Sequence, residues 1–168
     1  VNTSPQVVVA AVEGFAIAGG FGILCVSDVA ICTEGAGFAM SETALGIVPA
    51  QIAPFVAARI GVPQTRHLTL TAARFKGPEA LRLGIVHYLV QDSAALDAKL
   101  EEVLKQIDKC APIANALTKQ VVMKVGTEPL SSVLDFAADK FAEARRGPEA
   151  AEGLRAFAEK RPPRWAVE

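Results

Sequence analysis

Short runs of apolar, often β-branched residues mark the first half of the chain. Val7 to Val12 is a continuous apolar run between a proline and a glycine, and Asp28 to Cys32 and Ile85 to Val90 have a similar character. Such runs are typical of strands that are buried on both faces of a sheet. After a turn at Thr33 to Gly37, we expect a third, short strand at Phe38 to Met40.

Helical segments separate these strands. Phe21 to Val26 follows two glycines and is predicted to be a short buried helix. Gln51 to Ile60 and Pro63 to Ala72 are predicted as two further helices, because each opens beside a proline, which suits the first turn of a helix. Pro78 to Leu83 is another helix, and the glycine after it is a stop signal.

From Ser93 onward the apolar positions recur at helical spacing. One apolar stripe contains Leu96, Leu100, Val103, Leu104 and Ile107. Pro112, Pro129 and Pro148 are expected to mark the boundaries between the later helices. A strand-rich half followed by a run of helices indicates an α/β core with a helical appendage.

Composition narrows the possible partners and compartments. The 168 residues suffice for one hydrophobic core, and the formal net charge of -1 provides no broad positive field for nucleic acid or an anionic membrane. The uncharged run from Gly14 to Ser27 is too short to span a bilayer, which needs about 20 apolar residues. Cys25, Cys32 and Cys110 lack the spacing of a disulfide framework or a zinc site. We expect buried thiols in a reducing compartment, the cytoplasm.

Glycines are densest just after the first predicted strand, at Gly14, Gly19, Gly20 and Gly22. Glycine lets the backbone approach a ligand, and the start of a helix offers free amide donors with a partial positive charge. This predicts a site for an anion. A dinucleotide phosphate is disfavoured, because Ile23 to Cys25 stands where the third glycine of that fingerprint belongs. Close helix packing is the alternative explanation.

Three blocks of sequence, in this order and spacing, resemble the crotonase family of enoyl-CoA hydratases and isomerases. They are Val12-Glu13-Gly14 with Ala18-Gly19-Gly20; Phe38-Ala39-Met40-Ser41-Glu42 with Leu45-Gly46-Ile47-Val48-Pro49; and Leu70-Thr71-Ala72 with Leu83-Gly84-Ile85-Val86. Glu152-Gly153, Ala156-Phe157 and Glu159-Lys160-Arg161 resemble the family's carboxyl-terminal helix. The resemblance implies a crotonase-type β/α spiral core, with residues 1–92 as its carboxyl-terminal portion. Residues 93–168 would then form a helical region for trimerisation and CoA binding, in a homotrimer or hexamer.

The resemblance also implies an oxyanion site. In that family two backbone amides stabilise the enolate of a thioester, and one of them falls on Gly19, with Gly20 beside the substrate. The other donor belongs to a segment that precedes Val1. We therefore expect that this chain alone lacks a complete active site and, as it begins without methionine, that it starts partway into a longer product.

Two carboxylates carry protons in the best-known hydratases of the family, and they align with Gly22 and Glu42. Only Glu42 has a side chain. One carboxylate can move a proton between two carbons, as isomerisation requires, or protonate the α-carbon while water adds at the β-carbon. Apolar residues around Glu42, such as Phe38, Met40 and Leu45, disfavour an ionised carboxylate and so favour an acid/base role. An exposed turn glutamate is the alternative.

The loop from Pro49 to Pro54 replaces a glycine-rich loop that is usual in the family's hydratases. It resembles the loop of hydratases that act on 3-substituted glutaconyl-CoA thioesters (methylglutaconyl-CoA or isohexenylglutaconyl-CoA), which also tend to have glycine at the position of Gly22. A chance match of a variable loop is the alternative. Gln51 is a candidate to position a water or a distal carboxylate, or is a plain helix-start residue.

At the carboxyl end, the resemblance aligns Lys160 with a lysine that meets the CoA phosphates and Phe141 with an aromatic residue beside the adenine. A solvated lysine and a core phenylalanine are the alternatives. His67 and His87 have no partners at ligand spacing, so we expect no metal and no cofactor other than the CoA of the substrate. Hydration of an α,β-unsaturated acyl-CoA is the leading hypothesis, followed by double-bond isomerisation and by a non-catalytic CoA-binding paralogue.

Overall fold

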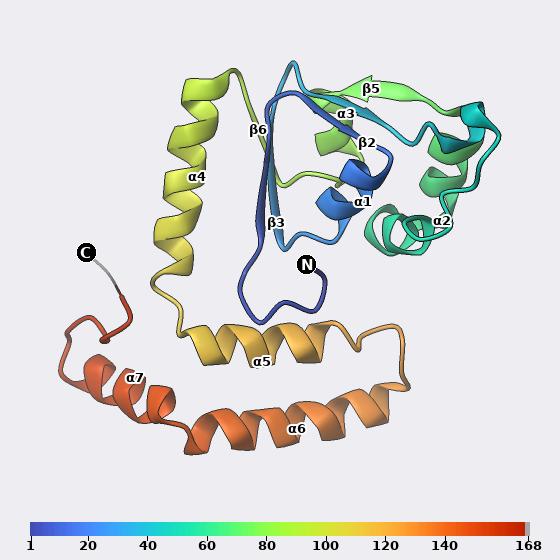
Figure 1. Ribbon diagram of the computed structural model, residues 1–168. Coiled ribbons are helices and arrows are strands. Elements are labelled where there is room, and N and C mark those ends of the chain that lie inside the picture. Colours follow the sequence, from blue (N-terminus) through green and yellow to red (C-terminus); the bar gives the residue numbers. More distant parts are fainter. Residues whose placement is uncertain (167–168) are drawn as a thin grey trace. The chain divides into compact units, whose positions relative to one another are not determined.

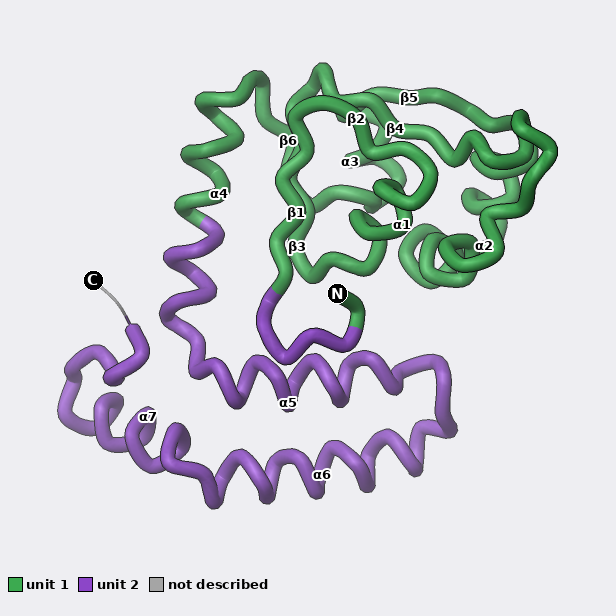
Figure 2. The backbone as a smooth tube through the Cα atoms, viewed as in Figure 1, with its two compact units in different colours: residues 1–2, 8–102 green, residues 3–7, 103–168 purple. Residues whose placement is uncertain are grey.

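The structure is a computed structural model that describes residues 1–166 (Figure 1). The chain forms two compact units (Figure 2). Unit 1 comprises Val1–Asn2 and Val8–Glu102, and unit 2 comprises Thr3–Val7 and Val103–Glu168. The division falls inside a helix that begins at Ser93, the residue at which the sequence places the start of the helical region. The trimerisation and CoA-binding roles of that region stay predictions.

Unit 1 contains two small sheets. β1 (Val9–Val12), β3 (Val29–Thr33) and β6 (Tyr88–Val90) form a parallel sheet in the order β1-β3-β6. β2 (Phe15–Ile17), β4 (Gly37–Ala39) and β5 (Arg74–Lys76) form the second sheet, in which β4 is parallel to β2 and antiparallel to β5. The four strands predicted from the sequence are confirmed with shifted ends, whereas β2 and β5 were not predicted.

Helices connect these strands. They are α1 (Gly19–Cys25), the short 3₁₀ helix η1 (Glu42–Leu45), α2 (Ala53–Thr71), α3 (Gly77–Arg82) and α4 (Ser93–Ile107). The two helices predicted on either side of Pro63 run together as α2, but Gly61 interrupts them with non-helical angles (φ 77°, ψ 158°). The sequence signal for a break was therefore correct.

Aromatic side chains hold the centre of unit 1. Phe38 stacks on Phe75 with ring centroids 5.6 Å apart, and Phe21 meets the edge of Phe75 at 6.1 Å. Phe21 and Phe38 are almost completely buried, so Phe75 of β5 joins α1 to β4 through these two ring contacts. Cys25 and Cys32 are buried as expected, but Cys110 is exposed, which corrects that part of the expectation.

Unit 2 is helical, with α5 (Pro112–Val122), α6 (Leu130–Arg146) and α7 (Pro148–Ala158). Pro112 and Pro148 are the first residues of their helices and Pro129 precedes α6 directly, so the predicted boundaries are confirmed. α6 packs against both α5 and α7. Among the helices of residues 1–166, none has the length and apolar character needed to cross a bilayer.

Candidate active site

The first turn of α1 presents free backbone donors. Gly22 donates its amide to the carbonyl of Ala18 at 3.1 Å, which closes the first turn. The amides of Gly19 and Gly20 donate to no acceptor within residues 1–166, and a β-carbon placed on either glycine would have no atom within 4 Å. Both glycines are exposed, so these two unpaired donors lie at an accessible helix start, where a developing negative charge is stabilised.

Ala18 sets the direction of the Gly19 amide. Its φ of 51° and ψ of -122° lie in a region that residues with a β-carbon rarely adopt, at a cost of about 1–3 kcal/mol. The conformation is held because the amide of Ala18 donates to the carbonyl of Ala39 in β4 at 3.1 Å. Sequence reasoning missed this residue, since alanine gives no signal for a positive φ.

Glu42 is the buried carboxylate of unit 1. It opens η1 and is 9% exposed, and its Oε2 has no hydrogen-bond partner among the described residues. An unpaired buried carboxylate oxygen costs stability, so Glu42 is not the exposed turn glutamate that was the alternative. Phe38 and Met40 before it are buried, as expected. Leu45, in contrast, is 75% exposed, so the expected apolar enclosure is wrong for the residues that follow.

Gly22 has no room for a side chain. A β-carbon there would lie 2.4 Å from Cγ2 and 2.8 Å from Cβ of Ile52. The position that aligns with the family's first carboxylate is therefore filled by an aliphatic side chain from the loop before α2. Gln51, next to Ile52, is exposed and precedes the first residue of α2. Its predicted contact with substrate stays a prediction.

The CoA-binding candidates lie in unit 2. Phe141 is 72% exposed, so it is not plain helix core, and with Leu154 and Trp165 it lines an apolar cavity of about 460 Å³. Lys160 is exposed and has a positive φ of 54° in the turn after α7. Their roles toward CoA stay predictions.

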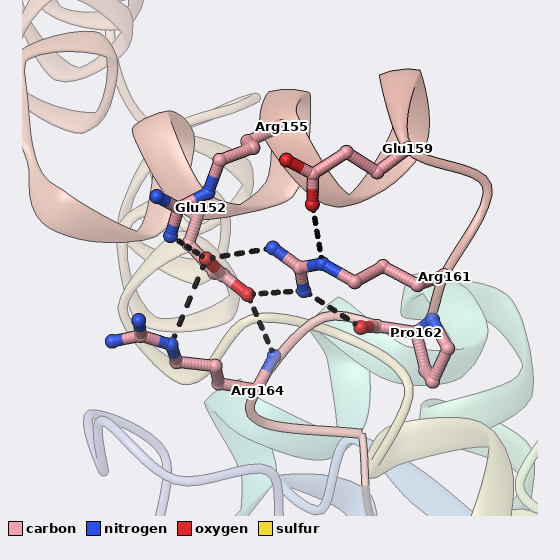
Figure 3. Close-up of polar contacts among 6 residues, drawn as sticks. All are labelled: Glu152, Arg155, Glu159, Arg161, Pro162 and Arg164. Carbon is pink, nitrogen blue, oxygen red and sulfur yellow. Dashed lines mark hydrogen bonds and ion pairs between the residues drawn. The ribbon is translucent and has the colours of Figure 1, made fainter.

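Glu152 anchors the segment after α7 through Arg161 and Arg164 (Figure 3), and Lys160 directly precedes Arg161 in the sequence. Its carboxylate is 8% exposed and accepts hydrogen bonds from Arg161 at 2.8 Å, from Arg155 at 2.6 Å and from the backbone amide of Arg164 at 3.2 Å. The guanidinium groups of Arg161 and then Arg155 lower the pKa of Glu152 to about 2. Sequence reasoning gave Glu152 no role, although a Glu and an Arg three residues apart on a helix are a known pairing signal.

The two histidines have structural or surface positions. The Nδ1 atom of His87 accepts a hydrogen bond from the amide of Ala30 at 2.9 Å, and the guanidinium of Arg59 lies 3.3 Å from its Nε2. His67 is exposed. Within residues 1–166 no three His, Cys, Asp or Glu side chains are grouped as metal ligands.

Comparison with known proteins places this geometry in a family. The sequence profile of the enoyl-CoA hydratase/isomerase family matches residues 1–168. The chain belongs to that family. Its structure is similar to that of an enoyl-CoA hydratase/isomerase from Marinobacter aquaeolei, with a TM-score of 0.95 and 49% identity over 99% of this chain and 63% of the other. It is equally similar to AtuE from Pseudomonas aeruginosa, with a TM-score of 0.95 and 54% identity over 99% of this chain and 64% of the other.

A curated relative gives the same family. Carnitinyl-CoA dehydratase of Citrobacter koseri is 32% identical over 163 residues, which are 94% of this chain and 62% of that protein. The chain thus spans less than two thirds of the length of these relatives. The crotonase-type α/β fold expected from the sequence is confirmed, and the family acts on acyl-CoA thioesters.

Proposed function

We propose that the full-length protein adds water across the double bond of an α,β-unsaturated acyl-CoA, with Glu42 as its acid/base. The observation that carries the proposal is the buried Oε2 atom of Glu42, which has no partner within residues 1–166. A buried carboxylate oxygen without a partner lowers stability, and active sites are where proteins keep such a cost for the sake of activity.

The reaction needs only one carboxylate. The amide of Gly19 donates to the thioester oxygen. Ionised Glu42 takes a proton from the attacking water as the water oxygen bonds to C3, and the electron pair of the double bond moves through C2 to the thioester oxygen. As the enolate collapses, Glu42 delivers the proton to C2, so that one water is added and the carboxylate is restored.

We further propose that the substrate is of the 3-substituted glutaconyl-CoA type. This substrate class is supported by the sequence of the loop from Pro49 to Pro54 and by Gly22, which has no side chain. Isomerisation is the second candidate, because a lone Glu42 can also move a proton between two carbons of the acyl chain.

Glu42→Gln tests the assignment in the full-length protein. Glutamine keeps the shape of the side chain but cannot exchange a proton, so turnover should fall by about 10²–10⁴-fold while the affinity for a saturated acyl-CoA stays within a few-fold. Glu34→Gln, at an exposed turn, is the matched control and should retain activity. Wild-type turnover in the Glu42 variant would refute the mechanism.

Heavy-oxygen water separates the two reactions. Label in the product of the wild-type protein indicates hydration, whereas a moved double bond without label indicates isomerisation. If the protein binds acyl-CoA and converts no enoyl-CoA, it is a binding paralogue and both reactions are excluded.

A homotrimer or hexamer is proposed from the family resemblance. The exposed apolar side chains of unit 2 support it, because they leave more apolar surface than a monomer usually exposes; they include Val122, Leu130, Leu134, Phe141, Leu154 and Phe157. Light scattering of the full-length protein at micromolar concentration tests it, and a clean monomer would contradict it.

A further inference from the structure

The side chain of Ile52 packs directly against Gly22 in α1. We infer that Ile52 is a specificity-determining residue, whose methyl groups form an apolar wall beside the first carbons of the acyl chain and select chains that are branched at C3. This inference rests on the proposed function, in which the thioester oxygen binds at the amide of Gly19.

Ile52 occupies space that any other residue at position 22 would need. A β-carbon at Gly22 would come within 2.4 Å of Cγ2 and 2.8 Å of Cβ of Ile52, closer than carbon atoms approach in proteins. The second of these atoms adjoins the main chain, so rotation of the side chain does not relieve the overlap. The backbone of α1 and the side chain of Ile52 are thus in direct contact.

This contact lies next to the proposed oxyanion site. Gly22 follows Gly19 by three residues in α1, and residues at that spacing lie on the same helix face about 5–6 Å apart. C2 and C3 of an acyl group lie two and three bonds from its thioester oxygen, so an acyl chain that runs along α1 from an oxygen bound at Gly19 reaches the position of Gly22 and Ile52. In this proposal the methyl groups of Ile52 border these carbons.

Ile52 is held in place by its main chain. Its amide donates to the carbonyl of Pro49 at 3.2 Å, and its carbonyl accepts from the amides of Phe55 and Val56 at 3.0 Å each. Val56 is completely buried, which anchors this turn in the core. Because isoleucine is also stiff at χ1, the wall has a fixed shape. The side chain is only partly buried, so part of its surface is available to a ligand.

A fixed apolar surface raises the affinity for a substrate that fills the space beside it. A methyl branch at C3 buries apolar surface against Ile52, whereas a straight chain leaves that surface uncovered. One methyl or methylene group in an apolar pocket changes discrimination by about 10–200-fold. Ile52 offers no hydrogen bond, so it cannot hold a second catalytic water in the way that a carboxylate at position 22 would.

Ile52→Ala in the full-length protein tests the inference, with Ile60→Ala as the matched control. Ile60, within α2, is likewise a partly buried isoleucine, and it packs against the same core as Ile52. The dissociation constants of butanoyl-CoA and 3-methylbutanoyl-CoA are measured by calorimetry. These ligands are saturated, so the readout does not depend on turnover. Ile52→Ala should reduce the preference for the branched ligand by about 10-fold, and Ile60→Ala should leave it unchanged.

The outcomes separate this inference from the proposed function. If Ile52→Ala and Ile60→Ala leave the same preference as wild type, Ile52 does not select the substrate, whatever Glu42→Gln shows. If the wild type binds neither ligand, the proposed function fails as well. Ile52→Val removes a single methyl group and serves where the alanine variant does not fold; it should shift the preference in the same direction by a smaller factor.

Discussion

The hydroxyl of Thr43 donates a hydrogen bond of 2.6 Å to the backbone carbonyl of Thr69. Thr43 follows Glu42 in η1, and Thr69 lies near the end of α2. The bond therefore ties the turn that carries the carboxylate to a long helix. Since Oε2 of Glu42 makes no polar contact within residues 1–166, contacts of its neighbours must hold this side chain in position.

Thr43→Val should lower turnover while leaving acyl-CoA affinity nearly unchanged. Valine has the shape of threonine but cannot donate, so η1 loses its link to α2 and Glu42 loses alignment. Misplacement of about 1 Å costs up to 10²-fold in rate. The measurement is kcat and KM on an enoyl-CoA, and Thr43→Ser should restore most of kcat.

Thr71→Val is the control for this prediction. The hydroxyl of Thr71 also donates to a backbone carbonyl at 2.6 Å, but its acceptor is His67 within the same helix. Equal losses of kcat in the two valine variants would show that Thr43 acts through general stability rather than through Glu42.

Glu42→Leu should stabilise the protein, although the proposed mechanism predicts that it removes activity. Leucine removes a buried carboxylate oxygen that has no partner within residues 1–166, and relief of that cost is worth about 1–3 kcal/mol. Urea unfolding measures the gain. Glu34→Leu, at an exposed position, should change stability much less, and a destabilised Glu42→Leu would contradict the assignment of an unpaired buried oxygen to Glu42.

Local pattern predicted the parts of the fold that local physics determines. Apolar runs gave the strands at Val7 and Asp28, and Pro112, Pro129 and Pro148 gave the starts of the later helices. β2 and β5 have three residues each, and their formation depends on pairing with β4 rather than on any period of their own.

The candidate site also has some features that the sequence predicts and others that it does not. The family-like blocks predicted Gly19 and Glu42 as candidates, but the strained φ of Ala18 and the packing of Ile52 onto Gly22 depend on segments that are distant in sequence. Such contacts arise only when β4 and the loop before α2 have folded against α1. No local sequence pattern predicts these contacts.

His87 should make stability fall as the pH drops below about 6.5, the ordinary pKa of histidine. Desolvation of its ring, and then the nearby Arg59, lower the pKa of His87 although the residue as a whole is exposed, and its Nδ1 must be unprotonated to accept from Ala30. Since the folded state binds the proton less readily than the unfolded state, the contribution is complete above this pH and is lost as the pH falls through the folded pKa. Thermal unfolding between pH 7.5 and about 5 measures the slope.

The second histidine provides the control. Both histidines are exposed, but the ring of His87 accepts a hydrogen bond from the backbone amide of Ala30, so His67→Gln should retain the pH slope, whereas His87→Gln should flatten it. An unchanged slope in His87→Gln would assign the pH dependence to other groups.

Glu152 should contribute stability that disappears only in strong acid. Hydrogen bonds from Arg161 and Arg155 hold its pKa at about 2, below the ordinary value of 4.5. A lowered carboxyl pKa means that the contribution is complete above about pH 4.5 and is lost as the pH falls toward about 2. Glu152→Gln should therefore lower the unfolding temperature at pH 7, with a difference from wild type that narrows as the pH approaches that of the folded pKa.

An exposed ion pair gives the comparison for Glu152. Glu128 pairs with Lys124 at 2.5 Å on the surface of unit 2, and such pairs contribute only about 0–1 kcal/mol, so Glu128→Gln should have little effect at any pH. Because Glu152 also anchors the segment that directly follows Lys160, its glutamine variant should bind CoA more weakly than Glu128→Gln does (Figure 3). If Glu152→Gln loses stability but binds CoA with unchanged affinity, Glu152 has a structural role and Lys160 does not contribute to CoA binding.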